Sequence, residues 1–189
     1  DLPLTDGAIG YVTYDYGMKE MGLTSQHETK VTMADMKWGF YDFFIIEDLK
    51  DHSLWFIANG HTEPAPVLLK KMEDLIAAKM ANFKSQSLAE TYPLAIHPDS
   101  TSDEYAQALH KLMDYLIAGD VYVTNFTGTL TVDCQCPPYT FFSRLRRDNP
   151  SPFGAYLQYD SYQIISASME RLLRINGKKI ETRPIKGTR

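Results

Sequence analysis

The sequence lacks long apolar runs and any excess of basic residues. No stretch approaches the roughly 18 consecutive apolar residues that would span a bilayer, so we expect no membrane segment. The 24 acidic residues outnumber the 19 lysines and arginines, which gives a net charge of −5. We therefore expect no nucleic-acid partner, because such proteins carry a basic surface.

Cysteine is also scarce. The two cysteines, Cys134 and Cys136, are separated by one residue. A disulfide across one residue would be strained, and two thiols do not provide the four ligands of a structural zinc site. The five histidines show no ligand spacing. We expect reduced thiols and a cytoplasmic protein.

The chain has no initial Met and begins at Asp1. No basic start followed by an apolar segment precedes the first expected strand, so no signal peptide is expected in this sequence. The length of 189 residues suits one domain with a sizeable core. We expect a segment trimmed from a longer protein, with residues 1–189 forming the N-terminal to central part of one enzyme domain.

Periodicity and turn residues predict a mixture of strands and helices. In the first half, aromatic and β-branched residues predict strands, a polar stretch predicts a hairpin, and proline marks the start of a helix. The expected elements are strands at 7–16, 39–47 and 54–59, a helix opened by Pro64 or Pro66, and polar loops near 17–37 and 85–100.

The second half carries stronger local signals. Thr101 and Glu104 form a capping-box pattern, and Gly119 ends the helix that they open. Further expected elements are a long strand at 121–132, a helix at 138–147, strands at 153–159 and 162–168, and a type I′ hairpin over 172–182 with Asn176-Gly177 at its turn. This order predicts an α+β fold with mostly antiparallel sheets and flanking helices.

The hairpin predicts that Glu170 and Lys186 approach each other, since they lie just outside its two ends. Pro184, two residues before the lysine, restricts the backbone. Gly187, directly after the lysine, lets the backbone come close to a ligand. A carboxyl and an amine placed together form an acid–base or nucleophilic pair. A nucleophilic lysine must lose its proton, so its pKa would have to fall from about 10.4 towards roughly 7–8. A surface salt bridge at the hairpin base is the alternative.

Arginines also surround the hairpin. Arg171, Arg174 and Arg183 would suit a carboxylated substrate, or they would be solvated strand edges that deter aggregation. The arginines of the short helix at 138–147 fit its solvated face.

Five segments resemble the chorismate-utilising enzymes. Glu181-Thr-Arg-Pro-Ile-Lys-Gly-Thr-Arg189 resembles the family signature, and the Ser-Ala-Ser-Met-Glu-Arg-Leu-Leu of 166–173 resembles the family's S-x-S-P-E-R-F-L. Residues 119–127, 149–157 and 7–15 are similar to further family blocks. The matches run in order along the whole chain, so the resemblance implies part of the chorismate-binding fold.

The resemblance implies roles for four residues. Lys186 would be the nucleophile and Glu170 the general acid/base, while Gly187 and Thr188 would line the substrate pocket. The P-I-K-G-T sequence is similar to the aminodeoxychorismate synthase branch, which aminates chorismate on the route to p-aminobenzoate and folate. Anthranilate, isochorismate and salicylate synthases usually carry alanine at the position of Lys186. Two alternatives stay open: another chorismate enzyme in which Lys186 is incidental, or a non-catalytic module that binds tryptophan or a partner.

The family also binds ligands and partners. Pro152 and Phe153 match a tryptophan pocket whose other wall comes from an N-terminal motif that this sequence lacks. Met169 replaces the usual proline before Glu170, which loosens the turn at the general acid/base. The resemblance implies Mg²⁺, with ligands in a later half of the enzyme, and a glutamine amidotransferase component that supplies ammonia. We therefore expect residues 1–189 alone to be inactive.

Overall fold

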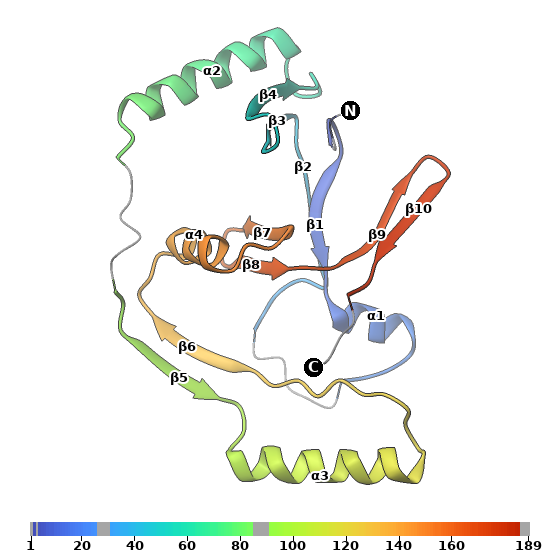
Figure 1. Ribbon diagram of the computed structural model, residues 1–189. Helices are drawn as coiled ribbons and strands as arrows, with labels where there is room; N and C mark the ends of the chain where they lie inside the picture. Colours follow the sequence, from blue (N-terminus) through green and yellow to red (C-terminus); the bar gives the residue numbers. More distant parts are fainter. Residues whose placement is uncertain (1, 3, 26–30, 85–90, 186–189) are drawn as a thin grey trace. The chain divides into compact units, whose positions relative to one another are not determined.

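The structure is a computed structural model that describes residues 2, 4–25, 31–84 and 91–185. The chain divides into two compact units, Asp1–Ser85 and Gln86–Arg189. Each described unit combines two-stranded antiparallel sheets with helices, which Figure 1 colours along the sequence. This confirms the expected α+β class with antiparallel sheets and flanking helices.

Two strand pairs form the sheets of the first unit. β1 (Ala8–Val12) pairs with β2 (Met36–Phe40), and β3 (Phe43–Asp48) pairs with β4 (Ser53–Ala58). The β3–β4 hairpin confirms the predicted reversal through the polar stretch. The single strand expected at 39–47 is wrong, because the chain turns at Tyr41 and Asp42 between β2 and β3.

Asp42 explains that break. Its carboxylate accepts hydrogen bonds from the backbone N–H of His61 at 3.0 Å and of Thr62 at 2.8 Å. The Thr62 hydroxyl donates to the same carboxylate at 2.6 Å. The turn before β3 is thereby tied to the loop after β4. These bonds hold the pKa of Asp42 well below its usual range, with the Thr62 hydroxyl as the largest cause.

The first helix was not expected. α1 (Tyr14–Glu20) occupies residues assigned to the strand at 7–16 and to the loop at 17–37. The Thr13 hydroxyl accepts from the backbone N–H of Tyr16 at 3.2 Å, which is N-cap geometry. The loop prediction is also wrong at Met36, where β2 begins.

α2 (Ala65–Ala81) begins after Pro64, as predicted from the prolines. The helix packs on β4. Leu68 of α2 and Phe44 of β3 are the buried apolar side chains among the residues that the structure describes.

In the second unit, β5 (Leu94–Pro98) pairs with β6 (Leu130–Cys134), and α3 (Ser102–Ala118) lies between them in sequence. The loop expected at 85–100 is therefore wrong over β5. The capping box of α3 is confirmed, since Thr101 and Glu104 exchange backbone and side-chain hydrogen bonds. Gly119 ends the helix in the left-handed region at a φ of 80°, as its position predicted.

The long strand predicted at 121–132 is largely wrong, because strand structure begins only at Leu130. The strand register with β5 ends where Pro98 faces Leu130, and one further backbone bond follows, from the Asp99 N–H to the Thr129 carbonyl oxygen at 3.0 Å. Beyond that pair, the Asp99 carboxylate accepts from the backbone N–H of Thr129 at 2.8 Å. The β-rich composition of 121–129 therefore finds no further partner in β5.

The remaining helix and strands are confirmed. α4 (Pro138–Asp148) packs on the hairpin of β7 (Phe153–Gln158) and β8 (Gln163–Ser168). The Tyr156 ring lies 5.4 Å from the Tyr139 ring and 5.7 Å from the Phe142 ring, measured between centroids. Aromatic packing thus joins α4 to this hairpin.

β9 (Arg171–Asn176) and β10 (Lys179–Arg183) form the predicted hairpin, drawn in red at the end of the chain in Figure 1. The expected type I′ turn is wrong. Asn176 pairs with Lys179, so Gly177 and Lys178 are the central residues, and of these Gly177 alone has a positive φ, at 58°. That pattern of φ angles matches a type II′ turn.

Candidate active site

Glu170 lies in the two-residue connection between β8 and β9. Its exposed carboxylate accepts a hydrogen bond from the backbone N–H of Ile185 at 2.8 Å. The Ser168 hydroxyl donates to the Glu170 carbonyl oxygen at 3.4 Å. The hairpin of β9 and β10 thus brings its two flanking segments together, as the sequence predicted.

Lys186 follows Ile185 directly in the sequence. Lys186, Gly187 and Thr188 lie outside the described residues, so the predicted pairing of Lys186 with Glu170 stays a prediction. The same holds for the pocket-lining roles of Gly187 and Thr188. The structure nevertheless carries the backbone that precedes Lys186 to the Glu170 carboxylate.

A charged cluster lies beside Glu170 at the open end of the hairpin. Arg171 Nη1 donates to Glu181 Oε1 at 2.5 Å, and Arg183 Nε lies 2.6 Å from the same oxygen. The Arg171 side chain is 21% exposed and the Glu181 side chain 37% exposed. We call these three residues the Arg–Glu–Arg cluster.

The cluster keeps Glu181 ionised. Partial burial alone would raise the pKa of this carboxyl. The charge of Arg183 and the hydrogen bond from Arg171 outweigh that effect and hold the Glu181 pKa below its ordinary value. Glu181 is therefore an anion at neutral pH, bound between two cations.

The cluster gives two of the three arginines near the hairpin a partner within this chain. Arg171 and Arg183 bind Glu181, a role that neither alternative described. Arg174 faces Glu181 in the strand register and acts on its carboxyl through charge. Glu181 was not predicted as a partner of Arg171, because the register counted from the turn places Arg174 opposite Glu181.

Phe153 connects this cluster to β7. The Arg171 guanidinium carbon lies 5.0 Å from the centre of the Phe153 ring, a cation–π distance. Pro152 precedes Phe153 in the sequence and is exposed. The tryptophan pocket assigned to Pro152 and Phe153 stays a prediction.

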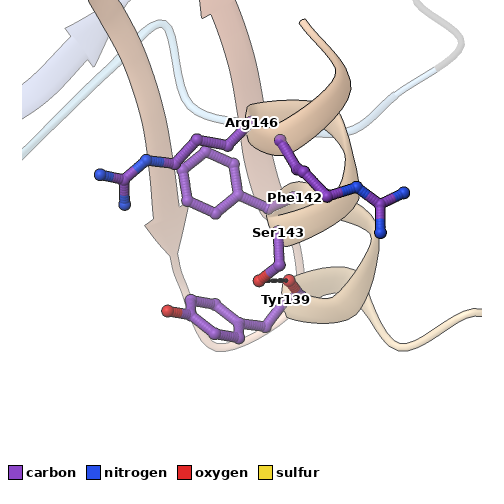
Figure 2. Close-up of a pocket in the computed structure, with 5 residues that line it drawn as sticks. Tyr139, Phe142, Ser143 and Arg146 are labelled. Carbon is purple, nitrogen blue, oxygen red and sulfur yellow. Dashed lines mark hydrogen bonds between the residues drawn. The ribbon is translucent and has the colours of Figure 1, made fainter. Parts of the chain in front are cut away.

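A shallow hollow of about 310 Å³ lies on α4, and Figure 2 shows the side chains that line it. Its lining residues are Tyr139, Phe142, Ser143, Arg146 and Arg147. The Ser143 hydroxyl donates to the Tyr139 carbonyl oxygen at 2.8 Å, and Arg147 forms two hydrogen bonds with Asp148. These interactions stay within α4, and the hollow shares no residue with the Glu170 site.

The described part of the chain contains no group of three or more His, Cys, Asp or Glu side chains that could hold a metal ion. The helices in the described ranges are too short or too polar to cross a membrane.

Comparisons with known proteins find similarity along nearly the whole chain. A family model described as chorismate binding enzyme matches residues 1–189. Aminodeoxychorismate synthase component 1 of Bacillus subtilis (strain 168) is 32% identical over 186 residues, which are 97% of this chain and 40% of that protein. Anthranilate synthase component 1 of Lactococcus lactis (strain IL1403) is 28% identical and matches 100% of this chain and 42% of that protein.

A solved structure supports the fold. The anthranilate synthase component I of Streptococcus pneumoniae TIGR4 superposes with a TM-score of 0.81 at 22% identity, over 95% of this chain and 42% of that one. This likeness confirms the expected partial fold. The chain spans about two fifths of the length of the relatives that it matches.

Proposed function

The chain belongs to the family of chorismate binding enzymes, and from this premise we propose that it is part of an aminodeoxychorismate synthase. The proposed reaction is the conversion of chorismate and ammonia to 4-amino-4-deoxychorismate and water. The observation that supports this choice most strongly is Lys186 in P-I-K-G-T, next in sequence to the Ile185 backbone that binds Glu170.

In the first step, the neutral Lys186 amine adds at C2 of chorismate. The ring double bond shifts, and the C4 hydroxyl leaves as water after it receives a proton from Glu170. The Lys186 nitrogen then gives its surplus proton to the Glu170 carboxylate, which restores the acid for the second step. Two successive displacements retain the configuration at C4, which a single displacement would invert.

In the second step, ammonia adds at C4 and the lysine amine leaves from C2. Glu170 donates its proton to the departing lysine nitrogen and takes one from the added ammonia, so Lys186 returns as a free amine. A carboxylate within hydrogen-bond reach of the reacting segment suits this alternation between acid and base. The sum of both steps is chorismate plus ammonia giving the amino product plus water.

The proposal includes partners from outside this chain. The relatives are named as component 1, which supports a second component for this protein, and we assign to it a glutamine amidotransferase that supplies ammonia. The Mg²⁺ that the resemblance implies would draw its ligands from outside the described residues.

Anthranilate synthesis is the competing function, because a relative of that name covers the whole chain. The two activities differ in product, so the complete gene product should be incubated with chorismate, ammonium and Mg²⁺ and the products separated by mass. We expect 4-amino-4-deoxychorismate, and Lys186→Ala should abolish it.

Lys178→Ala is the matched control, since it removes a lysine from the turn at the other end of the same hairpin. It should leave product formation unchanged. Anthranilate as the main product, or an active Lys186→Ala variant, would contradict the proposal.

A further inference from the structure

The open end of the β9–β10 hairpin contains a register shift. Ile180 faces Ile175 and Glu181 faces Arg174, but the next pair is Arg183 with Arg171. Two residues of β9 therefore stand against one residue of β10, which is a β-bulge. The bulge places two arginines directly opposite each other.

Two cations in directly opposed positions destabilise a strand pair. Glu181 removes this conflict, because its Oε1 atom lies within 2.6 Å of both guanidinium groups. Phe153 holds Arg171 from the side of β7, and the Thr182 hydroxyl donates to the Arg171 carbonyl oxygen at 3.5 Å. The two strands stay paired at Arg171 and Arg183 because the Glu181 carboxylate bridges the two positive charges.

The pairing of Arg171 with Arg183 determines where the backbone on either side of the hairpin lies. Arg171 is preceded by Glu170, and Arg183 is followed by Pro184 and Ile185. If the two strands separated at this pair, the Ile185 N–H would leave the Glu170 carboxylate, which it now meets at 2.8 Å.

We propose that Arg171, Glu181 and Arg183 are positioning residues that hold the Ile185 backbone against the Glu170 carboxylate. The inference rests on the proposed function only for its consequence, that the segment entering Lys186 is placed for the reaction. Its geometry and its test involve no chorismate.

The test measures the Ile185 amide in the ¹⁵N-labelled chain by NMR. In the wild type, the hydrogen exchange of the Ile185 amide should be slowed, because its N–H is bound to the Glu170 carboxylate. In Glu181→Gln, which keeps the side-chain shape and removes the charge, the exchange should quicken roughly two- to tenfold, as expected for loss of one hydrogen bond.

Two further variants separate this role from a general effect on the fold. The double variant Glu181→Gln/Arg183→Gln removes one of the opposed cations, so it should restore much of the Ile185 protection. Arg174→Gln removes a charge that faces Glu181 but lies outside the cluster, and should leave Ile185 as in the wild type.

The outcomes are decisive in either direction. An unchanged Ile185 amide in Glu181→Gln, or no restoration in the double variant, would overturn the proposal. Loss of the Ile175 and Ile180 pairing near the turn would also overturn it, because the cluster would then be needed for the hairpin itself. The NMR results do not depend on turnover of chorismate. Failure of the proposed function would instead appear in the products that the complete gene product forms from chorismate.

Discussion

At the scale of single residues, the Glu170 carboxylate has one oxygen bound to backbone and a second with no partner among the residues that the structure describes. One carboxylate oxygen accepts the Ile185 N–H at 2.8 Å. A carboxylate offers two oxygens, so the second is available for proton transfer. Position and chemistry therefore depend on different atoms of the same side chain, and substitutions can separate them.

Glu170→Gln should keep the acceptor for Ile185 and lose the acid/base function. We expect turnover of chorismate to fall by about 10²- to 10⁴-fold, the usual contribution of a general acid or base. Glu170→Ala removes both functions and should be at least as slow. Steady-state product formation by the complete gene product measures this, and wild-type rates in Glu170→Gln would exclude the assigned role.

Asp42 gives a pH dependence in the first unit. Its pKa in the folded chain is lowered, first by the Thr62 hydroxyl and then by the backbone N–H groups of His61 and Thr62. The stabilisation is therefore present above the pKa of the unfolded chain, near 3.8, and is lost as the pH falls through the folded value.

Asp42→Asn should lower the denaturant midpoint at pH 7, and the difference from the wild type should shrink as the pH falls below about 4. Urea unfolding followed by tryptophan fluorescence reports this unit directly, because the two tryptophans, Trp38 and Trp55, lie in β2 and β4. A difference that is constant from pH 7 to pH 3 would contradict the assigned cause.

At the scale of elements, close approach of strands restricts side-chain size. A β-carbon on Gly10 of β1 would overlap the carbonyl oxygen of Lys37 and contact Trp38 in β2. Gly17 of α1 has open space around its position. The two glycines form a matched pair for testing the β1–β2 contact.

Gly10→Ala should destabilise the first unit by about 1–3 kcal/mol, the usual cost of overpacking. Gly17→Ala should instead stabilise it by up to about 1 kcal/mol, because alanine favours the helix over glycine. Urea unfolding compares both with the wild type, and an undiminished midpoint in Gly10→Ala would show that the strands separate at little cost.

Local signals in the sequence predicted the elements whose causes are local. Thr101 caps the start of α3, Gly119 ends α3 in the left-handed region, and Pro64 precedes the first turn of α2; the structure confirms all three helix ends. The strand at 121–132 failed because its length depends on a distant partner that ends at Pro98. The aromatic run at 14–16 resembled a strand, yet the Thr13 cap made it helical.

The candidate active site shows the same difference between features with local causes and features that depend on distant residues. The approach of Glu170 to the end of β10 was predictable from the hairpin alone. The Arg–Glu–Arg cluster was not, because counting from the turn places Glu181 opposite Arg174, and only the bulge brings Arg171 opposite Arg183. A register shift of one residue changes which side chains meet, and the sequence does not mark it.

At the scale of the whole molecule, many apolar side chains of the second unit are exposed. Leu172 is 88% exposed and Ile180 70% exposed on the β9–β10 hairpin. The chain also spans about two fifths of its relatives, so the proposed reaction draws on more than these residues.

Residues 1–189 alone should therefore fail to aminate chorismate when supplied with ammonia and Mg²⁺. Product analysis by mass is the measurement, with the complete gene product as the positive control. Amination by the 189-residue chain would show that Glu170 and Lys186 need no further catalytic groups.

The most direct test of the central claim is the mass of the complete gene product after incubation with chorismate and Mg²⁺ in the absence of ammonia. The account predicts an adduct equal to chorismate less one water, located on Lys186 by peptide mapping and absent from Lys186→Ala. An adduct that persists in Lys186→Ala, or an unmodified protein that still aminates chorismate through no covalent intermediate, would contradict it.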